Sequence, residues 1–460
     1  MLASRLSKRL RLLSAALLAS CSASIDAPSS AAVRATCRPP VDSAPSAVRW
    51  DNGGHLCYLG ALEENIVRLE TASPDDREII IGDIAVYLSM LGEDAGVRHA
   101  IAAMADERSA PAGQAPDVEG IRGAEARDEI LKRAASTRVV IINEAHHVSR
   151  HRDFVRQLLP GLRALGYTHL AAEGLAFDLP PAKANSHSPD QSFGFYIRDP
   201  AYARLLRDAR GLGFTIVPYD AAPQSPGLDR VTSMQVRERS QAQTLLARTV
   251  DGNENARLIA LVGYDHVEEN ARRRSDGKGD FYWMAAEFKR LSGIDLLTID
   301  QTTLNPEGKP RLESPFYRPL LSELAPTSSV VLVNDNGPVV LGRFKGRVDL
   351  QVLHPADPLI KGREKWRWSN ARPIWPKLPR SASAQPRLFL AQARPADAGD
   401  SIPLDQAVTS AAAPVPLLVP RSARVRVVLT PIAPAIAKAI QEARGGGEAL
   451  RSALHGEPSE

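Results

Sequence analysis

The stretch VVIINEAHHVSRHRDF, residues 139–154, holds the densest group of side chains able to do chemistry in this sequence. An apolar run ends in the carboxylate Glu144, and His146, His147 and His151 follow it. An imidazole near its ordinary pKa accepts a proton at neutral pH, and imidazoles together with carboxylates also bind metal ions. Glu144 and His146 are therefore candidate functional residues. His147 and His151 have the four-residue spacing of a ligand pair on a helix, but solvated surface histidines are the more common cause of such a spacing.

Polar side chains also follow three other predicted strands, at the point where each strand ends. Glu173 ends the strand in THLAAE, Asp220 ends FTIVPYD, and His266 follows RLIALVG. Because the carboxyl ends of parallel strands share one edge of a sheet, where ligands bind, we expect these residues to lie close to Glu144 and His146. Taken singly, Glu173 can cap a turn and Asp220 can organise one. Their shared position at four strand ends indicates a functional site more strongly than any one of these residues does alone.

The elements that position these residues alternate between about residues 121 and 310. Apolar strands such as RVVIIN and RLIALV are separated by amphipathic helices. This alternation is typical of an α/β domain with a mainly parallel sheet flanked by helices. A helix predicted from about Ser149 to Leu165 carries Phe154 and several leucines on one face, and Asp199-Pro200 is a typical helix start.

Composition divides the rest of the chain into further parts, as expected for 460 residues, which exceed one ordinary core. A Ser-, Ala- and Pro-rich stretch is typical of a tether. Ser73-Pro74 begins a mostly helical stretch. Short strands separated by Asn-Gly, Pro and Ser/Ala-rich turns predict a small β-sandwich-like domain at the C-terminal end. The predicted parts are a signal peptide at 1–20, a tether at 21–48, a helical segment with a linker at 49–120, the α/β domain at 121–310 and the β domain at 311–460.

The N-terminal sequence MLASRLSKRLRLLSAALLASCS has the layout of an export signal, with four basic residues, a short apolar run and small residues at its end. It resembles a bacterial lipoprotein signal, in which the chain is cut before a cysteine that receives a lipid. Here that residue is Cys21, and an ordinary secretory signal with an incidental cysteine is the alternative. The resemblance implies a membrane anchor, and Ser22 after the cysteine favours the outer membrane, facing the periplasm.

Charge bears on one class of partner. The formal net charge of +4 includes the four basic residues before Cys21, so the mature chain is expected to be neutral. A neutral chain gives no support for a nucleic-acid partner. A hydrophobic content of 44% with 24% charged residues is ordinary for a globular protein, so the bulk of the chain is not expected to lie within a membrane.

Cys37 and Cys57 are the other two cysteines. In an exported protein, two cysteines about twenty residues apart most simply form one disulfide, worth about 3 kcal/mol in the chain-entropy model. Two unpaired thiols or a metal site are the alternatives. Each of them requires a reducing compartment or nearby partner residues.

Several of these motifs, together and in this order, resemble the superfamily that joins erythromycin esterases, ChaN-type haem-binding lipoproteins and Tiki-type proteases. Its first motif, Gly-Glu-x-His, corresponds to residues 143–146, Asn-Glu-Ala-His, with Asn in place of the usual Gly. Its second motif, Gly-x-x-His, is intact at residues 263–266, and LAAEG and the Arg-containing helix VRERSQAQTL complete the match. The resemblance covers roughly residues 121 to 305. It implies functional roles for Glu144, His146, Glu173, Arg237 and His266.

The chemistry that these residues support best is hydrolysis by an activated water molecule. His146 would act as the general base, oriented by a carboxylate such as Glu173. Arg237 or His266 would stabilise the oxyanion that forms from an ester, lactone or peptide-like substrate. No nucleophilic serine is needed, and the Gly-x-Ser-x-Gly motif is absent from the sequence.

Two other interpretations stay open. In a metal-dependent variant, one divalent ion, with zinc, manganese or cobalt suiting the ligand types, would bind and activate the water. Its ligands would be His146, His266 and Glu144 or Glu173. From a different class, the ChaN branch implies a haem- or metal-binding lipoprotein without catalysis, which holds haem through a histidine. Asn143 in the first motif also fits a structural protein whose site is inactive.

A smaller signal lies in KGREKWRWSNARPIWPK, residues 361–377, where Trp366, Trp368 and Trp375 are interleaved with Lys and Arg. Such a segment can stack on sugars or bases, or bind an anionic polymer. In the plainer interpretation, the tryptophans close a small core and the cations are solvated.

Overall fold

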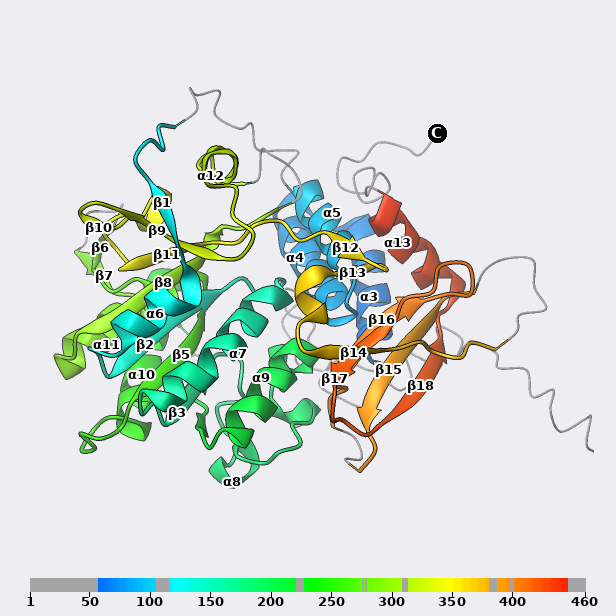
Figure 1. The fold of residues 1–460 in the computed structure, drawn as a ribbon, viewed down its shortest axis with the longest axis horizontal. Coiled ribbons are helices and arrows are strands. Elements are labelled where there is room, and N and C mark those ends of the chain that lie inside the picture. Colours follow the sequence, from blue (N-terminus) through cyan, green and yellow to red (C-terminus); the bar gives the residue numbers. More distant parts are fainter. Residues whose placement is uncertain are drawn as a thin grey trace, which may run out of the picture.

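The computed structural model describes residues 57–104, 116–220, 227–274, 277, 279–307, 313–379, 387–397 and 401–445. A large sheet with helices on both faces forms one side of the molecule, and helices with small antiparallel sheets form the other (Figure 1). The predicted α/β class, with a mainly parallel sheet, is confirmed. The lipidation and disulfide predictions concern Cys21, Cys37 and the side chain of Cys57, which lie outside the described residues.

The large sheet has nine strands in the order β1-β9-β11-β8-β2-β5-β3-β4, with β10 paired to β9. Within the run β11-β8-β2-β5-β3-β4, each strand is parallel to the next. The strand β9 runs antiparallel to its three neighbours β1, β10 and β11. The strands β2, β5, β3 and β4 are consecutive, so their carboxyl ends lie next to one another. The bounds are β1 Arg122–Glu125, β2 Val139–Glu144, β3 His169–Ala172, β4 Thr215–Val217, β5 Leu258–Gly263, β8 Leu296–Leu304, β9 Val330–Asn334, β10 Gly337–Pro338 and β11 Leu350–Leu353.

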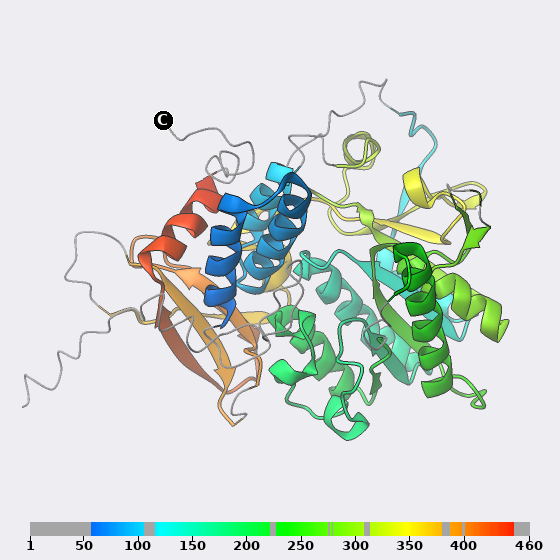
Figure 2. The same ribbon diagram turned by 180° about the vertical axis from the view of Figure 1, so that it is seen from behind.

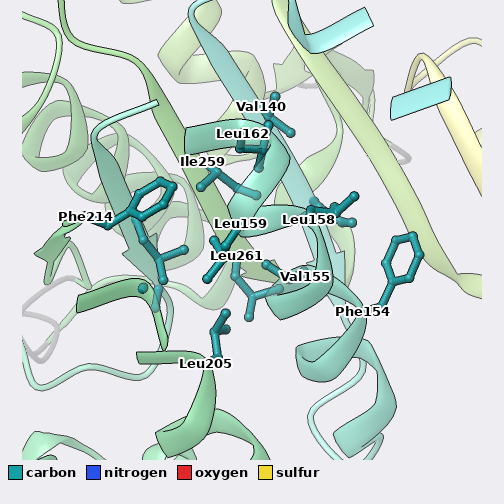
Figure 3. Packing of buried hydrophobic residues seen from close by; sticks show 14 of the residues in the cluster. Val140, Phe154, Val155, Leu158, Leu159, Leu162, Leu205, Phe214, Ile259 and Leu261 are labelled. Atoms are coloured by element: carbon teal, nitrogen blue, oxygen red, sulfur yellow. The ribbon is translucent and has the colours of Figure 1, made fainter. Parts of the chain in front are cut away.

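Side chains of β2 alternate between two apolar cores, one on each face of the sheet. Val140 and Ile142 pack with α7 and α9 on one face, and Val139 and Ile141 pack with α10 and α11 on the other. Figure 3 shows the first core, in which residues of β2 and β5 meet leucines of α7. Burial on both faces explains the uninterrupted apolar runs of β2 and β5. The helices are α6 Ala126–Ala134, α7 Ser149–Ala164, α9 Pro200–Gly211, α10 Arg230–Arg248 and α11 Met284–Ser292.

Two predicted helix starts are confirmed. The backbone N–H of Ala201 donates to the Asp199 side chain at 2.9 Å, and Pro200 is the first residue of α9. Ser73 caps α4, Pro74–Met90, in the same way. Because such caps satisfy backbone donors that a helix leaves unpaired, these short sequences fix where the helices begin.

The N-terminal helices and the C-terminal strands share one core, which the sequence did not predict. In the three-stranded sheet β16-β15-β18, Leu390 and Val408 pack against α3, α4 and α13, whereas Ala391 and Ala407 face the strand pair β14-β17. Figure 2 shows these helices beside the sheet. The bounds are α3 Cys57–Thr71, α5 Asp94–Met104, β14 Ala371–Ile374, β15 Phe389–Pro395, β16 Asp405–Thr409, β17 Leu417–Pro420, β18 Val425–Pro431 and α13 Pro434–Gly445.

The boundary predicted near residue 310 differs from the structure. The strands β9 and β11 lie beyond it, yet Val331 and Val352 are buried in the same core as Val140. Their short length and the Asn336-Gly337 turn gave them the appearance of a separate β domain. The small antiparallel sheets begin only after β11.

The remaining elements are short. They are α8 Pro181–Ala184, α12 Tyr317–Leu324, β6 Arg272–Arg273, β7 Asp280–Phe281, β12 Leu359–Ile360, β13 Arg363–Glu364 and the 3-10 helices η2 Gln191–Phe193, η3 Tyr196–Arg198, η4 Tyr264–Val267, η5 Gly342–Phe344 and η6 Lys365–Trp368. Within the described ranges, no helix has both the length and the apolar character needed to cross a membrane.

Candidate functional site

Neighbouring strands of the sheet end in the residues that the sequence singled out. Glu144 is the last residue of β2, Glu173 follows β3 directly, and Asp220 lies three residues after the end of β4. After β5 the chain turns into η4, which carries His266. Arg237 reaches the same edge from α10. These residues form two groups, which we call the Arg237 group and the His146 group.

The Arg237 group consists of Arg237, Glu173, Asp220, His266 and Glu238. The guanidinium lies at its centre: Nη2 donates to Glu173 Oε1 at 3.1 Å and to Asp220 Oδ1 at 3.3 Å, and Nη1 lies 3.1 Å from His266 Nε2. Burial alone would lower the pKa of Arg237, but Glu173 and Asp220 raise it. The guanidinium is therefore a permanent, fixed positive charge at the carboxyl edge of the sheet.

His266 is buried between two carboxylates. Its Nδ1 lies 2.5 Å from Oε2 of Glu238, which also accepts the backbone N–H of Met284 at 3.0 Å, and its Nε2 lies 3.6 Å from Glu173 Oε1. Burial would lower the pKa of His266, but Glu173 and Glu238 raise it above the ordinary value. Protonated His266 therefore stabilises the fold fully below its ordinary pKa of 6.5, and this contribution is lost as the pH rises through the raised pKa.

Two donors hold the carboxylate of Glu173. The backbone N–H of Gly263 donates to its Oε2, and Arg237 donates to its Oε1. Burial would raise the pKa of Glu173, but electrostatic interactions with His266, His146 and Arg237 lower it to about 2. Glu173 is therefore ionised at neutral pH and balances the cations around it.

Replacing Glu173 with Gln is expected to remove a pH-dependent part of the stability. Because the folded-state pKa of about 2 lies below the ordinary value of 4.5, the contribution is complete above pH 4.5 and is lost as the pH falls toward 2. Below this ordinary value, the difference in unfolding free energy between wild type and Glu173→Gln should shrink by about 1.4 kcal/mol per pH unit. Urea denaturation of both proteins at neutral pH and in mild acid measures this difference in unfolding free energy. A difference that stays constant throughout contradicts the expectation.

The His146 group consists of His146, Glu144 and Arg152. His146 Nδ1 lies 3.0 Å from Glu144 Oε1, and the Arg152 guanidinium donates to both Glu144 oxygens, at 2.6 and 2.9 Å. Burial would raise the pKa of Glu144, but Arg152 and His146 hold it below its ordinary value. The carboxylate that orients His146 is therefore Glu144 rather than Glu173, the carboxylate suggested from the sequence, whose oxygens bind the Arg237 group.

Two tyrosines fix the plane of the His146 ring. Tyr196 stacks on it with ring centroids 4.0 Å apart and an interplanar angle of 17°, and Tyr264 meets it edge-on at 5.1 Å. Tyr264 has a φ of 40°, a left-handed conformation that is strained for a bulky residue. The side chain of Asn143 donates to the Tyr264 carbonyl at 3.0 Å, and so helps to hold this conformation.

Asn143 supports the backbone beneath the site. It is fully buried, and its amide also donates to Asp300 Oδ1 at 3.0 Å and accepts the backbone N–H of Gln301 at 2.8 Å. These bonds tie β2, η4 and β8 together. Asn143 thus has a structural role, and Glu144 and His146 lie directly after it in the chain.

Gly263 lies where the two groups meet. A Cβ at this position would lie 2.6 Å from Cε1 and 2.8 Å from Nε2 of His146, and 3.0 Å from Glu173 Oε2. Its φ of −82° is open to any residue, so the requirement for glycine comes from close approach and not from backbone conformation. The Nε2 edge of His146 and Glu173 Oε2 therefore border the same small space.

Replacing Gly263 with Ala is expected to push the His146 ring away from Glu144 and to lower activity. Overpacking of this kind costs about 1–3 kcal/mol of stability. The matched control is Gly82→Ala in α4, where no atom lies within 4 Å of the added Cβ. Urea denaturation of both variants tests the prediction, and equal unfolding free energies would count against the close approach.

His151 is not the solvated residue that the sequence predicted. It is fully buried, because the first turn of α7 folds back against the sheet, and its Nδ1 accepts the backbone N–H of Ala145 at 3.1 Å. Burial lowers its pKa to about 3, so the ring is neutral. His147 instead points toward Tyr264, whose hydroxyl lies 3.4 Å from His147 Nδ1. His151 therefore supports the turn that carries the His146 group.

The side chains do not fit the predicted metal site. Across the part of the chain that the structure describes, no group of three or more His, Cys, Asp and Glu side chains could hold a metal ion. Both ring nitrogens of His266 already contact Glu238 and Arg237.

Several supporting residues were not identified from the sequence. Arg152 forms an ion pair with Asp199 as well, Nη1 to Oδ2 at 2.6 Å, so one buried cation holds two carboxylates. Glu238 and Tyr196 also escaped notice. The only local signals were a charged residue on the apolar side of a helix for Arg152, and the position next to Arg237 for Glu238.

Comparison with known proteins adds no assignment. No protein-family model matches the sequence, and no curated protein is significantly similar to it. A solved structure described as bacterial protein toxins aligns with a TM-score of 0.29 and 14% identity, over 49% of this chain and 46% of that chain. The type III effector HopBA1 aligns with a TM-score of 0.29 and 13% identity, over 52% of this chain and 99% of that chain. The C-terminal region of Pasteurella multocida toxin, described with a thiol-protease-like catalytic triad, aligns with a TM-score of 0.27 and 11% identity, over 85% of this chain and 56% of that chain. At these TM-scores the similarities support no conclusion about function.

Proposed function

We propose that the protein is a hydrolase that activates water through His146 and cleaves an ester, lactone or peptide-like bond. The observation that carries this proposal is the meeting of two groups at Gly263. On one side is an imidazole oriented by a carboxylate, and on the other is the fixed cation of the Arg237 group. Attack of water on a carbonyl needs such a base beside such a charge.

The hydrogen bond on Nδ1 makes His146 suited to be the general base. Ionised Glu144 accepts a hydrogen bond from Nδ1–H of His146, and in this tautomer the lone pair is on Nε2. Arg152 stabilises the negative charge of Glu144 and also donates to the His146 carbonyl at 2.8 Å. Nε2 points toward Gly263, where an added Cβ would lie only 2.8 Å from it.

Arg237 is the group best placed to stabilise negative charge on the substrate. Its side chain is 30% exposed, so a carbonyl oxygen can reach the guanidinium, while its contacts to Glu173 and Asp220 keep it in position. Charge stabilisation is strongest when the donor is fixed before the reaction. His266 contacts Nη1 from the buried side and acts as a positioning residue.

The reaction then follows in two steps. His146 Nε2 takes a proton from water as the water oxygen adds to the carbonyl carbon, and the negative charge on the carbonyl oxygen is stabilised by Arg237. The tetrahedral intermediate collapses, the bond to the leaving oxygen or nitrogen breaks, and the leaving group takes the proton from His146. The products are a carboxylic acid and an alcohol or amine, and the enzyme returns to its starting state.

The substrate screen that tests this proposal uses purified protein with chromogenic acyl esters, lactones and peptide anilides, with and without EDTA. We expect turnover of at least one class that persists in EDTA. Turnover that needs added zinc, manganese or cobalt would favour the metal-dependent mechanism. No turnover of any class, together with a Soret band after haem titration, would favour the haem-binding alternative.

We also propose that the enzyme is anchored to the outer membrane by a lipid on Cys21, which supports activity in the periplasm. Replacing Cys21 with Ala is expected to release the protein from the membrane fraction without changing its unfolding free energy, because the anchor precedes all described elements. Fractionation of cells that express both forms measures the release. If Cys21→Ala stayed in the membrane fraction as the wild type does, the proposed lipid anchor on Cys21 would be contradicted.

A further inference from the structure

A cavity of about 630 Å³ lies on the outer side of α7, apart from the His146 and Arg237 groups. It is bordered by the loop at residues 327–329 and by the segment from 357 to 369. This size is within the range of small-ligand sites, ~300–1,000 Å³. Phe154, Trp366 and Trp368 give its lining an aromatic surface.

The tryptophans do not close a core, contrary to the plainer interpretation of the sequence. Trp366 and Trp368 are partly exposed where they line the cavity, and Trp375 is 47% exposed. The cation between the first two is not solvated either. Arg367 is buried, and its Cζ lies 4.3 Å from the centroid of the Trp366 ring, so it covers part of this ring.

The two indoles are held in place by the protein itself. Trp366 Nε1 donates to Glu364 Oε2 at 2.6 Å, and Trp368 Nε1 donates to the Ile360 carbonyl at 3.2 Å. Both residues belong to η6, which restricts their backbone as well. Aromatic side chains that are ordered before binding lose little entropy when a ligand arrives.

The charges of the lining distinguish between the ligands that tryptophans commonly bind. Cations and carboxylates are equal in number, and several lie within ion-pair distance of each other, as in Arg127 with Glu125 and Arg150 with Asp357. The charged residues of the lining are Arg127, Arg150, Lys365, Glu125, Asp153 and Asp357. A site for a polyanion needs an excess of Lys and Arg over acidic residues. This lining therefore does not favour nucleic acids or sulfated polymers.

Uncharged polar groups complete the lining. Thr327, Ser328 and Ser369 contribute hydroxyls and Gln157 contributes an amide. Such groups can donate to and accept from the hydroxyls of a sugar, while aromatic side chains cover its apolar ring faces. We infer that the cavity binds a neutral oligosaccharide. This inference is independent of the proposed hydrolase activity, because no residue of the Arg237 group or the His146 group lines the cavity.

The test titrates the full mature protein with cellotetraose and with chitotetraose by calorimetry. Binding of at least one of them is expected, with an affinity that does not change when the salt concentration is raised. Trp366→Ala and Trp368→Ala should each weaken binding roughly tenfold or more, as expected for a tryptophan at the centre of a binding site. Trp375→Ala is the matched control, since Trp375 does not line the cavity, and should bind as wild type does.

Several outcomes would overturn the inference. They are no binding of either sugar at millimolar concentration, equal affinity in wild type and both cavity variants, or preferential and salt-sensitive binding of an oligonucleotide. Trp368→Phe keeps an aromatic ring and should retain most of the affinity, which separates loss of the site from loss of the fold. His146→Ala should bind sugar normally, so failure of the hydrolase proposal can be told apart from failure of this one.

Discussion

His146→Ala is expected to lower kcat/KM by roughly 10²–10⁴-fold, the contribution typical of a general base. The free energy of unfolding should change little, because Glu144 keeps both of its hydrogen bonds from Arg152 when the imidazole is removed. Steady-state kinetics on the substrate identified by screening measures the first effect. Urea denaturation measures the second.

The matched control for this variant is His187→Ala. His187 is exposed and belongs to neither group, so its removal should leave kcat/KM unchanged. If His146→Ala retained wild-type kcat/KM, His146 would not be the base. If it lost activity only because it unfolds, its role would be structural.

Arg237→Met is expected to lower kcat by roughly 10²–10³-fold, as is found when an oxyanion donor is removed. It should also reduce stability by about 3 kcal/mol, because it leaves the buried carboxylate of Glu173 and the partly exposed one of Asp220 without their cation. Glu173 and Asp220 are the two that Arg237 contacts through Nη2. Arg237→Lys keeps the charge but not the planar fork, so an intermediate loss is expected.

The control for Arg237 is Arg239→Met, an exposed arginine two residues further along α10. It should have wild-type kinetics and stability. Equal kcat in wild type and Arg237→Met would show that the guanidinium does not stabilise the transition state. A loss of stability without a loss of kcat would assign Arg237 a purely structural role.

The position of the site was predictable because strand periodicity determines it. Uninterrupted apolar runs identified β2 and β5 as strands buried on both faces, and parallel pairing then places their carboxyl ends at one edge. Glu144 and His266 follow from these two strand ends, and Glu173 follows from the end of β3 in the same way. No further knowledge of side-chain packing was needed to bring them together.

The partners within the site were not predictable, because they depend on how helices pack. Asp199 was recognised as the N-cap of α9, but its bond to Arg152 exists only because α7 and α9 lie side by side. In the same way, the choice of Glu144 rather than Glu173 as the partner of His146 depends on where Arg152 and Arg237 point. The sequence around each of these residues does not indicate which residue it will contact.

The extent of the large sheet beyond residue 310 was not predictable for a similar reason. Short strands with an Asn-Gly turn have the same local pattern whether they extend a large sheet or form a small one, as β9 shows. The packing of α3 and α4 against β15 joins segments that are about 300 residues apart in the chain. Periodicity shows which face of each element is apolar, but not which partner covers it.

Chemical rescue of His146→Ala tests the central claim most directly. Imidazole added to this variant can enter the space that the side chain has left, donate a hydrogen bond to Glu144 in place of Nδ1 and supply a lone pair beside Gly263. We predict that hydrolysis by His146→Ala rises with imidazole concentration and then saturates, while Arg237→Met shows no such rise. If imidazole left the rate of His146→Ala unchanged while the variant remained folded, His146 would not act as the base that activates water.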